Sequence, residues 1–149
     1  MNNVRPWLII GKYRETIQLP LLKQYSVGAL LHLADDVQHP GIESLSLVID
    51  DGKEVKPAHI RQGVDFVREQ KAADKVVMVA CGAGISRSSS FAIAALKEEE
   101  NLSLKDALVA VKTAHPPAFP HGALWESLTK YYDEDIPYDS IWRYLASSR

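Results

Sequence analysis

The sequence predicts an α/β domain on three observations. Residues 27–33 form an almost entirely apolar run, as in a central strand of a parallel sheet that is covered on both faces. A second apolar run, residues 76–80, leads directly into a loop of small residues, and residues 88–100 then show a helical pattern. Strand-like and helix-like segments alternate along the rest of the chain. Because 149 residues suffice for one hydrophobic core, we expect a single domain over residues 1–149.

The other segments complete this alternation. Short apolar runs indicate strands, and apolar residues at helical spacing indicate helices. Pro57 lies near the start of one predicted helix, Ser103 and Asp106 have the spacing of a helix cap, and Pro116 ends the helix that this cap begins. The predicted strands cover residues 8–10, 27–33, 44–49 and 75–80, and the predicted helices cover residues 16–24, 57–70, 88–100, 103–115, 122–132 and 139–146.

The most informative segment begins at Cys81, the only cysteine of the chain. A loop of small residues between a strand and a helix can direct backbone N–H groups and the positive helix terminus at a dianion. In that position the thiolate form of Cys81 is favoured, and the guanidinium of Arg87 offers a planar fork of donors for phosphate oxygens. A structural cysteine at a strand end is the alternative, but it leaves the glycines and Arg87 unexplained. The predicted phosphate loop consists of Gly82, Ala83, Gly84, Ile85, Ser86 and Arg87.

The sequence from Cys81 to Ser88, Cys-x5-Arg-Ser, resembles the active-site loop of the dual-specificity phosphatases, in the cysteine-based protein tyrosine phosphatase superfamily. Weaker similarities extend over nearly the whole chain. Residues 6–11 resemble the opening strand of that family, residues 27–33 its next buried strand, and residues 115–128 its proline-bearing segment. The resemblance implies a mostly parallel, twisted sheet of about four to five strands flanked by helices. It also implies hydrolysis of phosphate esters through a cysteinyl-phosphate.

The resemblance further implies a general acid in a loop upstream of the nucleophile, after a Val-x-Asp pattern. Val48 and Asp50 match this pattern, so we predict Asp50 as the acid and keep the adjacent Asp51 as the alternative. The Asp-Asp-Gly sequence is also typical of a turn. We predict that Ser88 donates a hydrogen bond to the sulfur of Cys81, although a hydroxyl at a helix N-terminus also caps backbone donors.

Two positions depart from the family pattern. The residue before the cysteine is usually a histidine that braces the loop, and here it is Ala80. A later Pro-Asn pair is replaced by Pro120 and His121, so either His121 takes over the bracing or the brace is missing. Members of the resembled superfamily that act on lipid or RNA carry extra basic residues in or beside this loop, whereas the residues between Cys81 and Arg87 here carry no cation. The resemblance therefore implies one phosphate ester on a protein side chain.

Composition restricts the expected partners. A net charge of −2 argues against a general nucleic-acid or membrane binder. Residues 7–10 are too short an apolar run for a signal peptide or a membrane span. A single cysteine excludes an internal disulfide and suits a reducing compartment, so we expect a cytoplasmic location. The histidines are scattered without metal-ligand spacing, so we expect neither a metal nor a cofactor. We expect a monomer that acts on a phosphorylated protein or peptide.

Other functions stay open. A phosphoprotein-binding module without turnover would use the same loop, although Cys81, Arg87 and a candidate acid are all present. A phosphatase for a non-protein phosphate ester is a second alternative. Three aromatic residues, Tyr13, Phe119 and Trp125, are candidates for the rim of the pocket, although an aromatic side chain is more often part of the core.

Overall fold

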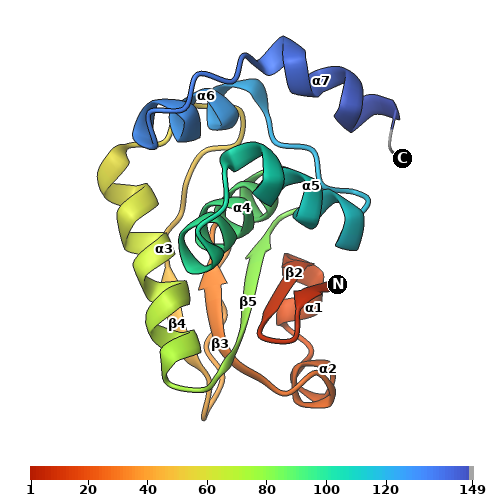
Figure 1. The fold of residues 1–149 in the computed structure, drawn as a ribbon. Coiled ribbons are helices and arrows are strands. Elements are labelled where there is room, and N and C mark those ends of the chain that lie inside the picture. The colour runs from red at the N-terminus through yellow and green to blue at the C-terminus, as the bar shows by residue number, and fades with distance from the viewer. Residues whose placement is uncertain (148–149) are drawn as a thin grey trace.

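The computed structural model describes residues 1–147, which form a five-stranded sheet with helices on both faces (Figure 1). The order of the strands is β1-β2-β5-β3-β4. Only β1 is antiparallel to its neighbour, and the other four strands are parallel. The predicted mostly parallel sheet of four to five strands is therefore confirmed. The strands are β1 (Asn2–Arg5), β2 (Leu8–Lys12), β3 (Val27–His32), β4 (Glu43–Ser46) and β5 (Val76–Cys81).

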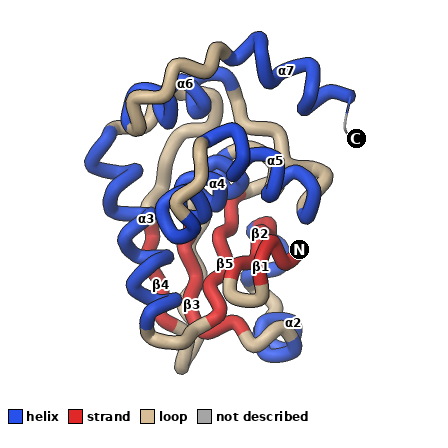
Figure 2. Tube along the Cα trace, in the orientation of Figure 1, coloured by secondary structure: helices blue, strands red, loops and turns tan. Residues whose placement is uncertain are grey.

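Helices form the two outer layers (Figure 2). Two short helices, α1 (Tyr13–Thr16) and α2 (Leu19–Gln24), cover one face of the sheet. The other face is covered by α3 (Pro57–Ala72), α4 (Arg87–Glu100) and α5 (Leu104–Ala114). Beyond these, α6 (Gly122–Tyr131) packs on α3 and α4, and α7 (Tyr138–Ser147) packs on α6. Within residues 1–147, none of the helices has the length and apolar character needed to span a membrane.

The strand β5 lies at the centre of the sheet, between β2 and β3. Its side chains alternate between two apolar clusters, with Val79 in the larger cluster under α3 to α6 and Met78 in the smaller cluster near α2. Both side chains are fully buried. Burial on both faces explains why this strand is continuously apolar in the sequence.

The structure departs from the predicted elements at the sheet edges. β1 was not predicted, because residues 2–5 are mostly polar and pair with β2 through their backbone. The predicted strand 44–49 ends at Ser46, yet the N–H groups of Leu47 and Ile49 still donate to the carbonyl oxygens of His32 and Leu33, at 2.8 and 3.1 Å. These bonds carry the chain after β4 to the end of β3.

The predicted helix boundaries hold in some places and not in others. The cap before α5 is confirmed, because the Ser103 Oγ accepts the Asp106 N–H at 3.0 Å. The predicted helix 16–24 is instead two helices, and Pro20 lies in the first turn of the second, where its missing N–H costs nothing.

His32 is a buried histidine at the end of β3, with 1% of its side chain exposed. In the sheet register it lies opposite Ala80 of β5. Burial lowers the pKa of its imidazole below the usual 6.5, and the Asp36 carboxylate, 3.7 Å from Nε2, opposes this only in part. The folded protein therefore resists protonation of this ring.

We expect the free energy of unfolding to decrease as the pH falls below about 6.5, because the unfolded chain then gains a proton on His32 that the folded chain does not bind. Replacing the ring in a His32→Asn variant should flatten this pH dependence. Urea unfolding at several pH values between about 7 and 5 measures it. His59→Asn, a change at a half-buried position on α3, serves as the control. An equal pH slope in parent and His32→Asn would contradict the prediction.

Candidate active site

Three segments meet at the carboxyl edge of the parallel strands. Cys81 is the last residue of β5, and Arg87 is the first residue of α4, so the phosphate loop spans the gap between strand and helix. The chain after β4 arrives at the same edge with Asp50 and Asp51. Side chains that follow parallel strands converge at this edge, which is where α/β proteins bind their ligands.

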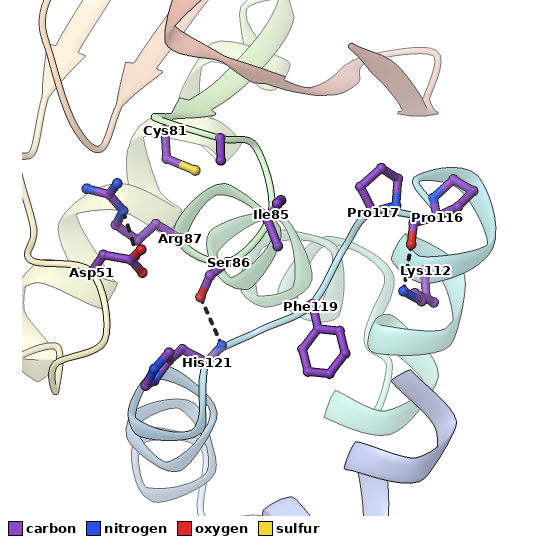
Figure 3. Close-up of a pocket in the computed structure, with 11 residues that line it drawn as sticks. Asp51, Cys81, Ile85, Ser86, Arg87, Lys112, Pro116, Pro117, Phe119 and His121 are labelled. Carbon is purple, nitrogen blue, oxygen red and sulfur yellow. Dashed lines mark hydrogen bonds and ion pairs between the residues drawn. The ribbon is translucent and has the colours of Figure 1, made fainter. Parts of the chain in front are cut away.

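A cavity of about 720 Å³ opens at this point. Figure 3 shows Arg87 and Asp51 on one side of Cys81, with the two prolines on the other side and Ile85 between them. The cavity is lined by Asp51, Cys81, Ala83, Ile85, Ser86, Arg87, Lys112, Pro116, Pro117, Phe119 and His121.

The thiol of Cys81 has a hydroxyl partner. Its Sγ lies 3.2 Å from the Oγ of Ser88, in a hydrogen bond between two buried side chains. A hydroxyl group can donate as well as accept, so Ser88 can donate to the sulfur when Cys81 is a thiolate. The site residues predicted at either end of the loop are thus in contact.

The guanidinium of Arg87 is held by backbone oxygens at the sheet edge. Its Nη1 donates to the carbonyl oxygens of Ile49, at 3.1 Å, and Leu33, at 3.5 Å. Its Nε lies 4.0 Å from the Oδ1 of Asp51. With only 16% of its side chain exposed, Arg87 presents a charge of fixed orientation to the cavity.

The backbone of the phosphate loop is suited to an anion. Within residues 1–147, the amide N–H groups of residues 82–86 donate to no backbone or side-chain acceptor. Gly84 has a φ of +69°, a conformation that glycine adopts without strain. A run of amide N–H groups without a protein acceptor, at the N-terminus of a helix, is an anion-binding arrangement.

Residues 115–121, here called the proline segment, hold this loop at three successive positions. A ring nitrogen of His115, Nε2, lies 2.7 Å from the carbonyl oxygen of Gly84. The Phe119 N–H donates to the carbonyl oxygen of Ile85 at 2.9 Å. The His121 N–H donates to the Oγ of Ser86, also at 2.9 Å.

The imidazole that contacts the loop therefore belongs to His115, and His121 contributes its backbone. From the sequence, either His121 takes over the bracing or the brace is missing, and His115 is not distinguished from the other scattered histidines. The one signal in the sequence was that His115 stands directly before Pro116 and Pro117 in the proline segment.

The two aspartates lie in different surroundings. Asp51 lines the cavity, with 60% of its side chain exposed. The side chain of Asp50 is 74% exposed, is not among the lining groups, and lies 3.7 Å from the ammonium of Lys53. In this conformation the structure brings Cys81, Arg87 and Asp51 together and leaves the Asp50 carboxylate outside the cavity.

The three aromatic residues considered for the rim lie in different places. Phe119 lines the cavity, whereas Tyr13 lies on α1 outside the lining. Trp125 is fully buried and donates its indole N–H to the carbonyl oxygen of Ile136 at 2.8 Å, so it belongs to the core, the alternative expected for an aromatic side chain, and not to the rim. Among the described residues, no group of three or more histidine, cysteine or acidic side chains is arranged to hold a metal ion.

The family model described as dual specificity phosphatase, catalytic domain, matches residues 8–134. The chain belongs to this family. It is 27% identical over 132 residues to mouse dual specificity protein phosphatase 19, covering 86% of this chain and 60% of the mouse protein. It is 25% identical to zebrafish dual specificity protein phosphatase 22-B, covering 95% and 79%. The crystal structure of human DUSP28 superposes with a TM-score of 0.83 at 27% identity, covering 89% of this chain and 96% of that one.

For this member of the dual specificity phosphatase family, we expect Gly84→Ala to weaken the binding of tungstate, a phosphate analogue, by roughly tenfold or more. A Cβ at residue 84 would lie 3.1 Å from the carbonyl oxygen of Gly11, and its φ would be strained. Gly41→Ala is the matched control, because Gly41 has a φ of +79° with no atom within 4 Å of a Cβ. Gly41→Ala should lower the free energy of unfolding by roughly 1 kcal/mol and leave tungstate binding unchanged. Calorimetric titration compares the two, and equal affinities would count against an anion site at the loop.

Proposed function

We propose that this chain is a cysteine-dependent phosphatase that hydrolyses single phosphate esters on the tyrosine, serine and threonine side chains of proteins. The observation that carries the proposal is one cavity in which Cys81 and Arg87 meet the amide N–H groups of the phosphate loop that have no protein acceptor. A nucleophile inside a dianion cradle is the equipment for covalent phosphoryl transfer. The catalytic-domain match over residues 8–134 supports it.

In the first step the Cys81 thiolate attacks phosphorus in line with the leaving oxygen. The S–P bond forms as the P–O bond to the substrate breaks, and a carboxylic acid protonates the departing oxygen. Arg87 and the loop amides bind the three equatorial oxygens as their charge redistributes. In the second step water attacks phosphorus, the carboxylate accepts a proton from the water, and the P–S bond breaks. Ser88, 3.2 Å from the sulfur, donates to the thiolate that leaves.

The turn with Asp50 and Asp51 supplies the acid in this proposal. The Val-x-Asp pattern supports Asp50, and the position in the cavity wall supports Asp51. Because the acid often comes into reach only in the substrate complex, the exposed position of Asp50 does not remove it from consideration. If Asp50 is the acid, Asp51 still lies beside the site, where its carboxylate helps to orient Arg87.

The lining of the cavity supports a protein substrate with one phosphate. Ile85, Pro116, Pro117 and Phe119 form an apolar wall beside the polar end at Arg87. A second cation in the lining, Lys112, is held in place because its ammonium donates to the carbonyl oxygens of Pro116 and Ala118, at 2.6 and 2.8 Å. The site thus offers its strongest anion contacts to a single phosphate and an apolar surface to the side chain that carries it. The proposal includes a reducing, cytoplasmic location, because Cys81 must stay a thiol to react. It also includes a monomeric state.

We expect Cys81→Ser to abolish hydrolysis of p-nitrophenyl phosphate while tungstate still binds.

Removing the general acid should lower the rate by about 10²-fold or more on phenyl phosphate, and less on the p-nitrophenyl ester, whose leaving group needs less protonation. It should also remove the decline of the rate at alkaline pH. Asp50→Ala and Asp51→Ala are compared on both esters, and the variant with both effects identifies the acid. A parent without turnover that still binds a phosphopeptide would instead support the binding module.

We expect Ile85→Asn to lower kcat/KM for a phosphotyrosine peptide by roughly tenfold and to change it far less for the matched phosphoserine peptide. The reason is that the longer aromatic side chain extends onto the apolar wall, which Ile85 helps to form with 41% of its surface exposed. Val109→Asn is the control, because Val109 is similarly exposed, at 38%, on α5 outside the cavity lining. Equal losses on both peptides would contradict this role of the wall.

A further inference from the structure

His115 connects the phosphate loop with the first strand of the sheet. It is the residue directly after α5, and only 5% of it is exposed. Its Nε2 lies 2.7 Å from the carbonyl oxygen of Gly84, and its Nδ1 lies 2.8 Å from the Nδ2 of Asn2. The ring is not part of the cavity lining, so it cannot act on a substrate directly.

The two contacts fix the tautomer of this ring. A carbonyl oxygen only accepts hydrogen bonds, so the Nε2 of His115 carries the proton and donates it to Gly84. In a neutral ring Nδ1 then accepts, and the side-chain N–H of Asn2 is the donor that faces it. Burial lowers the pKa of the His115 imidazole, which is consistent with the neutral form.

The contact at Gly84 determines how one peptide group of the loop is oriented. The carbonyl oxygen of Gly84 points to a buried ring outside the cavity. In a trans peptide the C=O and N–H groups point in opposite directions, so the N–H of Ile85 points away from His115. Without a donor at His115, this carbonyl would lose its buried partner, and a rotation of the peptide group would turn its negative end toward the phosphate.

From these contacts we infer that His115 is a positioning residue for the phosphate loop. By donating to Gly84 it keeps the Ile85 N–H directed at the bound oxyanion, and Asn2 holds the ring in the tautomer that can donate. This inference rests on the proposed function of the loop. Ala80, the residue before Cys81, has no polar side chain with which to brace the loop, and the ring of His115 supplies a brace from the proline segment.

The experiment measures oxyanion binding separately from turnover. Tungstate is titrated calorimetrically into Cys81→Ser protein with and without a second change, and kcat and KM are measured on p-nitrophenyl phosphate with Cys81 intact. His115→Leu removes the donor at similar volume. In His115→Gln, the side-chain amide can donate in place of Nε2. His59→Leu, on α3, is the matched histidine control.

His115→Leu should weaken tungstate binding by about tenfold, which is less than the roughly 10²- to 10³-fold loss in kcat when a donor to an oxyanion is removed, because here the Ile85 N–H is only misdirected. It should also lower kcat/KM and move the amide resonance of Ile85 in the NMR spectrum of the tungstate complex. His115→Gln should recover most of the affinity, and His59→Leu should leave it unchanged. Asn2→Ala should act in the same direction with a smaller effect, and its effect should not add to that of His115→Leu, because both act through one ring.

Equal tungstate affinity in parent, His115→Leu and Asn2→Ala would overturn the inference, as would equal losses of affinity in His115→Leu and His115→Gln. If His115→Leu does not fold, Asn2→Ala and His115→Gln still decide the matter by the same titration. Failure of the proposed function has a different signature, since the parent would then not hydrolyse aryl phosphates while its tungstate affinity still responded to His115.

Discussion

The strand β5 is hydrogen-bonded on both sides, to β2 and to β3, and its side chains enter apolar clusters on both faces of the sheet. A strand held in this way cannot shift along its axis without unpairing both neighbours and exposing buried side chains. Cys81 is its last residue, so the position of the sulfur is fixed by the packing of the whole domain. The phosphate loop, the start of α4 and the Ser88 hydroxyl take their places from that point.

Charge at the site is balanced by groups from separate segments. Arg87 is oriented by the carbonyl oxygens of Leu33 and Ile49, which follow β3 and β4, and it faces Asp51 across 4.0 Å. A guanidinium held by backbone oxygens keeps its full charge and loses little orientation when an anion binds. The sheet thus positions both Cys81, the proposed nucleophile, and the cation that would bind the phosphate.

The proline segment completes the site from the opposite side. Its residues bond to Gly84, Ile85 and Ser86 in succession, and Lys112 of α5 closes the turn that shapes it by donating to the carbonyl oxygens of Pro116 and Ala118. The same segment provides most of the apolar wall of the cavity. The part of the chain that braces the anion cradle is therefore also the part that would contact the rest of a substrate, which in the proposed function links orientation of the phosphate to recognition.

The sequence alone determined the α/β class, the central strands and the phosphate loop, because these depend on residues close together in the chain. The apolar run before Cys81, the glycines after it and Arg87 form a local pattern whose backbone geometry follows from short-range physics. β1 escaped prediction because its residues are mostly polar and its pairing with β2 is made through the backbone. Only the tertiary structure showed which aspartate lines the cavity, that Trp125 is buried, and that His115 contacts both Gly84 and Asn2. Asn2 and His115 are 113 positions apart, and such a pairing leaves no periodic signal in the sequence, since the folding of the intervening chain brings the two residues together.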